Sequence, residues 1–295
     1  MLFSSIANGH PLTPDNLGTV LPWWSFSKTV LAATALSLVR DGRVGLDDRL
    51  QEGPFTLRQL LRHEAGLADY GELADYHAAV AAGEAAWPAD EMLQRLDAST
   101  LRYPPGAGWR YSNVGYLLVA RLIQRLTDLG LEDAVNQRAL HPLGVSTVRL
   151  ATRQADLHTL SLGIPAGYDP AWVYHGLLIG PLSQATQFLD RLLAGHLLPP
   201  ALLEDLQRAR VLGGPIPGRP WQAPGYGLGV MQGPVEGGLM LCGHTGGGPG
   251  STLAVYRASE GQASACCAVF QEGHDQGAVE AQVVQQLMAA LRQGA

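Results

Sequence analysis

The sequence predicts an α+β protein: helices flank an antiparallel sheet, a helical lobe stands beside it, and a site can form in the crevice between them. Three observations predict this architecture. Helix-type periodicity dominates the first two thirds of the chain, four strand-like runs separated by Gly and Pro turns follow, and a helix-like run comes last. With 295 residues, 46% hydrophobic and 16% charged, the chain can also bury a large core. We expect a single domain over residues 1–295, with an α/β lobe at about 1–50 and 211–295 and a helical lobe at about 51–210.

The expected helices follow from composition and apolar spacing. Residues 26–40 are rich in helix formers and end at Asp41-Gly42, a typical stop signal. This places Ser25 at the N-cap or in the first turn of a buried helix. Three more helices are expected where apolar residues recur at helical spacing: residues 56–63, 114–127 and 183–194.

The C-terminal third has strand-like patterns. Short apolar runs alternate with Gly, Pro and Glu-Gly turns, which is typical of an antiparallel meander. We expect four strands in this region: residues 226–232, 238–242, 252–257 and 264–271. Residues 278–292 are expected to form a helix that covers the sheet.

Composition and charge exclude several classes of partner. A formal charge of -6 and a pI near 5.8 leave no basic face for nucleic acid. The first 24 residues lack the basic, apolar and cleavage-site regions of a signal sequence, and no later run has the roughly 18 apolar residues of a membrane span. We therefore expect no membrane partner and a cytoplasmic protein, or a periplasmic one if a signal sequence precedes this chain. The sequence leaves the oligomeric state open.

The cysteines and histidines predict neither a disulfide framework nor a metal site. Cys242, Cys266 and Cys267 are odd in number, and the last two are adjacent in a strand-like run, where their side chains should point to opposite faces. Buried free thiols are therefore expected. The pair His63-Glu64 lacks the second histidine of a His-Glu-x-x-His zinc motif. We expect no metal and no organic cofactor.

The most informative compositional fact is the single lysine. Arginine supplies 19 of the 20 basic side chains, and Lys28 is the other. An arginine keeps its proton inside a protein, whereas burial can tune a lysine amine to release one. Lys28 is therefore the leading candidate for a proton-transfer residue.

Ser25-Phe26-Ser27-Lys28 forms a Ser-x-x-Lys sequence. Residues i and i+3 of a helix share a face, so the lysine amine is expected beside the serine hydroxyl. A serine needs a base to act as a nucleophile at neutral pH, and a desolvated lysine can be that base, while the helix N-terminus favours negative charge. The alternative is a serine N-cap followed by a solvated lysine.

Tyr111-Ser112-Asn113 lies between a turn-rich segment and an expected helix. A phenol beside an ammonium can act as a phenolate or a proton shuttle, and the amide can hold a substrate carbonyl and the lysine. The alternative is a tyrosine packed against the lobe and an asparagine that caps the next helix.

Residues 243–250, Gly-His-Thr-Gly-Gly-Gly-Pro-Gly, lie at the end of an expected strand. The small residues would let a substrate backbone lie against this edge, and a backbone N–H here could pair with that of Ser25 in an oxyanion hole. The alternative is a flexible glycine hairpin with an incidental histidine.

In this order, three motifs resemble those of class C β-lactamases and the related carboxylesterases and D-aminopeptidases of the penicillin-binding-protein and β-lactamase superfamily: Ser25-x-x-Lys28, Tyr111-x-Asn113 and His244-Thr245-Gly246. Connecting segments are also similar to that family's recurring segments: residues 60–67, 105–106, 141–145 and 226–229. The resemblance covers most of the chain. It implies a β-lactamase/transpeptidase-like fold with one catalytic domain.

The resemblance also implies roles for the motif residues. Ser25 attacks the substrate carbonyl while Lys28 and Tyr111 share its proton, and Tyr111 later protonates the leaving group and activates the hydrolytic water. The implied substrate-binding groups are the Asn113 side chain, the backbone N–H groups of Ser25 and Gly247, the strand edge at Gly246, and His244 and Thr245 on the leaving-group side.

Two features depart from the family pattern. The third motif most often begins with a lysine that pairs with a substrate carboxylate, but here it begins with His244, which is mostly neutral at pH 7. This disfavours an anionic substrate. Members also usually have a helix and two strands before the nucleophile, yet 24 residues precede Ser25 here. We expect a sheet that is short at one edge, or a chain that lacks part of its natural N-terminus.

The leading functional prediction is a serine hydrolase that acts through an acyl-enzyme on small esters or amides, with an esterase favoured. His244, the apolar Trp23-Trp24 pair and the lack of an export signal support an esterase. The alternative is a β-lactamase or a D-alanyl or D-amino-acid peptidase, whose lactam or peptide substrates lie outside the cytoplasm. A non-catalytic binding protein on the same fold would be favoured by loss of a motif residue, and all of them are present.

Overall fold

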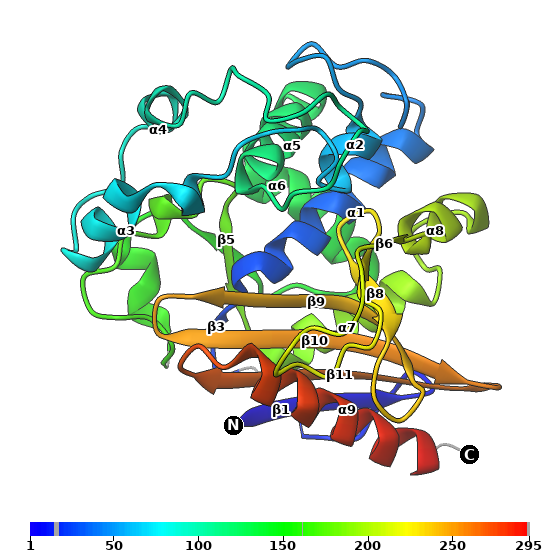
Figure 1. Ribbon diagram of the computed structural model, residues 1–295. Helices are drawn as coiled ribbons and strands as arrows, with labels where there is room; N and C mark the ends of the chain where they lie inside the picture. The colour runs from blue at the N-terminus through cyan, green and yellow to red at the C-terminus, as the bar shows by residue number, and fades with distance from the viewer. Residues whose placement is uncertain (15–17, 161, 294–295) are drawn as a thin grey trace.

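A large antiparallel sheet organises the computed structural model, which describes residues 1–14, 18–160 and 162–293. Its eight strands lie in the order β2-β1-β11-β10-β9-β8-β7-β6 (Figure 1). They are β1 Leu2–Ala7, β2 His10–Pro11, β6 Arg210–Val211, β7 Gly225–Tyr226, β8 Met231–Pro234, β9 Met240–Gly248, β10 Ser251–Glu260 and β11 Ala263–Glu272. A second sheet has three short strands: β3 Leu21–Pro22, β5 Leu177–Gly180 and β4 Arg149–Ala151. The predicted fold class is confirmed.

Helices cover both faces of the large sheet. Helix α9 (Gln276–Gln293), red in Figure 1, packs on β10 and β11, and α7 (Leu182–Leu193) packs on the same two strands from the other side. The side chain of Cys266 belongs to the core beside α7 and that of Cys267 to the core beside α9, as strand alternation requires. Together with Cys242, both are buried free thiols, as predicted.

Helix α1 (Ser27–Arg40) lies between the sheet and the remaining helices and is buried from Ser27 to Leu38. It packs mainly against α5 (Asn113–Thr127), whose N-cap Ser112 accepts the Gly115 N–H at 3.2 Å. The other α-helices among the described residues are α2 Leu57–Leu61, α3 Ala74–Ala81, α4 Ala89–Arg95, α6 Leu131–Val135 and α8 Pro200–Gln207. Helix α7 falls within the range expected for the helical lobe but packs on the sheet. Within the described residues, no helix is long and apolar enough to cross a membrane.

Two strand predictions differ from the structure. Residues 226–232 do not form one strand, because a turn separates β7 from β8. Gly229 in this turn has φ +80°, and a Cβ there would lie 2.4 Å from the Ala32 side chain, so the chain bends sharply against α1. Strand β9 is longer than predicted and continues through Gly248, because its glycines pair with β10. The motif that begins at His244 therefore lies within a paired strand.

Candidate active site

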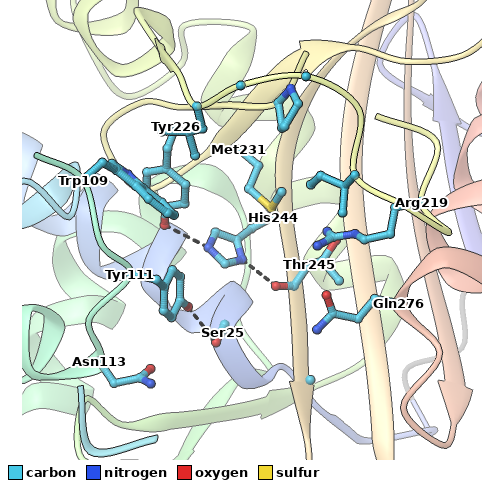
Figure 2. Close-up of a pocket in the computed structure, with 16 residues that line it drawn as sticks. Ser25, Trp109, Tyr111, Asn113, Arg219, Tyr226, Met231, His244, Thr245 and Gln276 are labelled. Carbon is cyan, nitrogen blue, oxygen red and sulfur yellow. Dashed lines mark hydrogen bonds between the residues drawn. The ribbon is translucent and has the colours of Figure 1, made fainter. Parts of the chain in front are cut away.

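Ser25 lies in a strained turn at the start of α1. The turn is a single 3-10 segment, Trp24–Phe26, directly before the helix. Trp24 has φ +43°, a conformation that bulky residues rarely adopt. Burial of the indole and its N–H bond to Ser251 Oγ, at 2.9 Å, hold this conformation. The turn therefore fixes the Ser25 side chain in the wall of a cavity, whose lining residues Figure 2 shows.

The first two motifs meet at the Ser25 hydroxyl. Lys28 Nζ lies 3.1 Å from Ser25 Oγ, and the Tyr111 OH donates to the same oxygen at 3.0 Å. Lys28 is completely buried, so the alternative of a solvated lysine is wrong. Burial lowers the pKa of Lys28 from 10.5 to about 7, although the charge of Asp69 opposes this shift. A base with this pKa can accept the Ser25 proton near neutral pH.

Tyr111 is held as a neutral phenol. Burial raises its pKa, and the hydrogen bond to Ser25 only partly offsets that effect. The His63 ring packs on the Tyr111 ring with centroids 4.2 Å apart, and His63 Nδ1 accepts the Ser112 N–H at 3.1 Å. The arrangement favours Lys28 as the base and Tyr111 as a proton donor.

Asn113 is the first residue of α5 and lines the cavity. Its backbone N–H and its side-chain amide donate to the two carboxylate oxygens of Asp69, at 2.8 and 3.2 Å. Asp69 thus fixes the amide so that its oxygen remains available as an acceptor. The helix cap is Ser112, so the alternative of Asn113 as the cap is wrong.

The third motif presents a neutral histidine. His244 Nδ1 lies 2.7 Å from the Thr245 carbonyl oxygen, which can only accept, so Nδ1 carries the proton. Nε2 then accepts from the Tyr226 OH at 2.9 Å (Figure 2). Burial and the Lys28 charge lower the pKa of His244 to about 3. Both ring nitrogens are used internally, so His244 has no N–H for a substrate carboxylate.

Thr245 is tied to a buried ion pair behind the cavity. Its hydroxyl donates to Glu280 of α9, which is completely buried. Glu280 also accepts from Trp221 Nε1 at 3.1 Å and from two nitrogens of Arg219, one of them at 2.7 Å. Arg219 is the cationic side chain on the cavity wall among the described residues, and Glu280 neutralises it.

The motif glycines allow β9 to approach the nucleophile. A Cβ at Gly246 would lie 2.7 Å from the Ser25 backbone nitrogen, which no side chain tolerates. Gly247 follows at the cavity wall. The backbone of β9 at Gly246 therefore lies directly beside the backbone of Ser25.

Two cavities meet along this edge. The first, of about 590 Å³, contains the motif residues and an aromatic and apolar wall formed by Trp109, Tyr226, Met231, Ile216 and Leu212. The second, of about 650 Å³, is lined by Tyr76, Tyr168, Val80 and Pro165 among others. They share Gly247 and Gln276, so the two cavities border one another at these residues. The described residues contain no group of three or more His, Cys, Asp or Glu that could hold a metal ion.

Five polar residues of this site were not predicted from the sequence: His63, Asp69, His175, Tyr226 and Glu280. A usable signal existed for Glu280, the only acidic residue in the helix expected at residues 278–292. His175 lies two residues before the apolar run of β5, but no sequence pattern linked it to Lys28. Its Nε2 lies 3.1 Å from Lys28 Nζ.

The comparisons with known proteins agree with this geometry. The family described as Beta-lactamase matches residues 2–282. A D-aminopeptidase of Cereibacter sphaeroides is 31% identical over 153 residues, which are 47% of this chain and 28% of that protein. Penicillin-binding protein 4* of Bacillus subtilis is 29% identical over 161 residues, 52% of this chain and 34% of that protein. The matches thus span about a third of these curated relatives.

Solved structures show the same fold. The D-amino acid amidase from Ochrobactrum anthropi SV3 superposes with a TM-score of 0.78 over 99% of this chain and 94% of that chain, at 21% sequence identity. The family match extends over nearly the whole chain and includes all three motifs. The chain therefore belongs to the beta-lactamase family of serine hydrolases.

Proposed function

We propose that this protein hydrolyses amides of D-amino acids that carry no carboxylate, and activated esters of similar size, through an acyl-enzyme on Ser25. The observation that carries the proposal is the Ser25 hydroxyl between Lys28 Nζ and the Tyr111 OH, at 3.1 and 3.0 Å, in the wall of a cavity where Glu280 neutralises the charge of Arg219. The D-amino-acid part rests on the relatives, a D-aminopeptidase and a D-amino acid amidase. They favour the peptidase alternative over the esterase that the sequence suggested first.

In the proposed acylation step, Lys28 acts as the base and Tyr111 as the acid. The Lys28 amine accepts the hydroxyl proton as Ser25 Oγ attacks the carbonyl carbon, since a base with a pKa of about 7 is half deprotonated at neutral pH. The neutral Tyr111 phenol donates a proton to the departing nitrogen and recovers one from the Lys28 ammonium. Water then attacks the acyl-enzyme by the reverse of these transfers. The N–H groups of Ser25 and Gly247 would hold the oxyanion.

The leaving-group side supports a substrate without a carboxylate. The two nitrogens of His244 and the Thr245 hydroxyl are engaged within the protein, and Glu280 matches the charge of Arg219. A penicillin or a D-alanyl peptide would bring a carboxylate to this side without a free cation to meet it. A charge-assisted hydrogen bond contributes about 1.5–3 kcal/mol, so its absence should weaken such substrates about 10- to 100-fold.

An esterase remains a second candidate because esters share the acyl-enzyme and need no cationic anchor. The neutral His244 favours it as much as it favours an amidase. Esters and amides differ in the leaving group, which must be protonated for an amide and leaves readily without a proton when it is a nitrophenolate. The ratio of the two activities separates the candidates.

A substrate panel tests the proposal. D- and L-phenylalaninamide, D-alanine p-nitroanilide, p-nitrophenyl acetate and butyrate, and nitrocefin would be compared by kcat/KM, with a Ser25→Ala preparation as the blank. We expect D-amides and nitrophenyl esters to be hydrolysed, D-amides faster than L-amides, and nitrocefin the slowest. Turnover of esters without D-amides would favour the esterase. Nitrocefin turnover equal to the best substrate would contradict the proposed preference for substrates without a carboxylate.

A further inference from the structure

Lys28 has a second polar contact that the mechanism above does not use. Its Nζ lies 3.1 Å from Ser25 Oγ and also 3.1 Å from Nε2 of His175, which precedes β5. His175 is 2% exposed, and its Nδ1 has no hydrogen-bond partner among the described residues. The rings of Tyr111 and Tyr116 complete the surroundings, with centroids 5.1 and 5.7 Å from Nζ.

The chemistry of a lysine base restricts what His175 can do. A neutral amine has one lone pair, and it must point at the Ser25 hydroxyl to remove the proton. If His175 donated a proton from Nε2 to that lone pair, Lys28 could not act as the base. Nε2 must therefore accept an N–H of Lys28, which places the ring proton on Nδ1. Burial and the Lys28 charge lower the pKa of His175 well below its usual range, so the ring stays neutral and can accept.

We propose that His175 is a positioning residue for Lys28: its Nε2 accepts a hydrogen bond from the lysine in both protonation states, directing the amine lone pair to Ser25 and stabilising the ammonium formed during acylation. The inference rests on the proposed role of Lys28 as the base. Ser25 and His175 approach Nζ at equal distances, so the base is held between its proton donor and a fixed acceptor. An acceptor bonds the ammonium more strongly than the amine. Loss of His175 should therefore lower the pKa of Lys28.

Other groups around Lys28 do not supply this acceptor. The titratable groups that face Lys28 or His175 from the elements packed against them are Asp69, His63, Tyr111, Tyr116 and His244. Asp69 acts on Lys28 through its charge, and its carboxylate oxygens accept hydrogen bonds from the backbone and side-chain N–H groups of Asn113. His63 uses Nδ1 for the Ser112 N–H, and its Nε2 has no hydrogen-bond partner among the described residues. Both nitrogens of His244 are engaged by Thr245 and Tyr226.

The single lysine makes a direct test possible. Labelling with ¹³C-lysine gives one resonance from the whole chain, and its chemical shift against pH reads the ionisation of Lys28 without any substrate. We expect the wild-type midpoint near 7. His175→Leu should lower it by about one pH unit or more, the size of a charge-assisted hydrogen bond, whereas His175→Gln, whose side-chain oxygen can replace Nε2, should keep it close to or above the wild-type value.

Activity provides the second readout. On the best substrate of the panel, His175→Leu should lower kcat/KM by about 10- to 100-fold, mainly through kcat, and move its acidic limb to lower pH. His175→Gln should retain most of the rate. If the pH midpoint of the Lys28 titration is unchanged or raised in His175→Leu, the proposal is overturned. In that case His175 only packs against Lys28 or donates a hydrogen bond to it.

Two controls separate positioning from folding. Leu287→Ala opens a cavity in the core beside α9 and should lower Tm without moving the lysine midpoint. If His175→Leu does not fold, the tautomer of His175 in the wild-type protein tests the proposal instead. ¹H–¹⁵N NMR should find the ring proton on Nδ1, and a ring proton on Nε2 would overturn the proposal. If no panel substrate is hydrolysed, the proposed function fails while the lysine titration still tests His175.

Discussion

Replacing Lys28 tests the proton transfer and the burial of its charge together. Lys28→Arg keeps a positive charge that cannot be released, and Lys28→Met keeps the unbranched shape without a charge. Burial lowers the pKa of Lys28 from 10.5 to about 7. At about 1.36 kcal/mol per pH unit, the folded protein disfavours a charge at this position by about 5 kcal/mol. A domain of this kind has a total stability of about 5–15 kcal/mol, so the arginine variant should lose a large part of it.

The methionine variant should show the opposite effect on stability. The folded-state pKa is below the unfolded value, so between pH 7 and 10.5 the unfolded chain binds a proton that the folded chain does not, and wild-type stability rises with pH. Lys28→Met removes this cost. It should be more stable than the wild type by a few kcal/mol at pH 7 and lose that advantage as the pH passes 10.5.

Both variants should lose activity. General acid–base catalysis contributes about 10²- to 10⁴-fold, and kcat/KM for a p-nitrophenyl ester should fall by at least that factor. Wild-type kcat/KM should rise with pH through about 7 as Lys28 loses its proton. The assays are kcat/KM against pH and urea unfolding at pH 7 and 10. An arginine variant with wild-type activity and Tm, or an active methionine variant, would refute the reasoning.

Three further predictions concern the rest of the site. Tyr111→Phe should slow amide hydrolysis at least about 10-fold more than p-nitrophenyl ester hydrolysis, because only the amine leaving group needs a proton; equal losses would remove Tyr111 as the acid. His244→Lys should raise kcat/KM for nitrocefin relative to D-phenylalaninamide by about 10-fold or more, and an unchanged ratio would show that His244 does not set the charge preference. Glu280→Gln should lower the free energy of unfolding by about 3–5 kcal/mol in urea, since it leaves Arg219 uncompensated. Adding Arg219→Gln should recover part of that loss, and strictly additive losses would contradict the pairing.

Much of the fold could be predicted because local signals agree with the final packing. Helix α1 combines helix formers with a Gly stop signal, and the last strands alternate between two cores so regularly that adjacent cysteines lie in different ones. The single strand predicted at residues 226–232 is wrong because Gly229 bends the chain against α1, a long-range contact without a local pattern.

The site residues also fall into those that local sequence patterns predict and those that depend on long-range contacts. Ser25, Lys28 and Tyr111 could be found from spacing and from the scarcity of lysine, since chemistry restricts those residue types. His175 and Asp69 could not, because they act through contacts between segments far apart in the sequence. The tautomer of His244 depends on the Thr245 carbonyl and the Tyr226 hydroxyl, and only the folded chain defines both.

The most direct test of the central claim is covalent labelling of Ser25 in the native protein. A fluorophosphonate reacts with a serine only where a base has activated it, so mass spectrometry should find one adduct, at Ser25, and none after denaturation. Ser25→Ala should still fold, with a loss of about 1–3 kcal/mol because Lys28 and Tyr111 lose their contacts with Oγ. It should neither react nor hydrolyse any substrate. A native protein that remains unlabelled, or a Ser25→Ala protein that keeps its activity, would contradict the account.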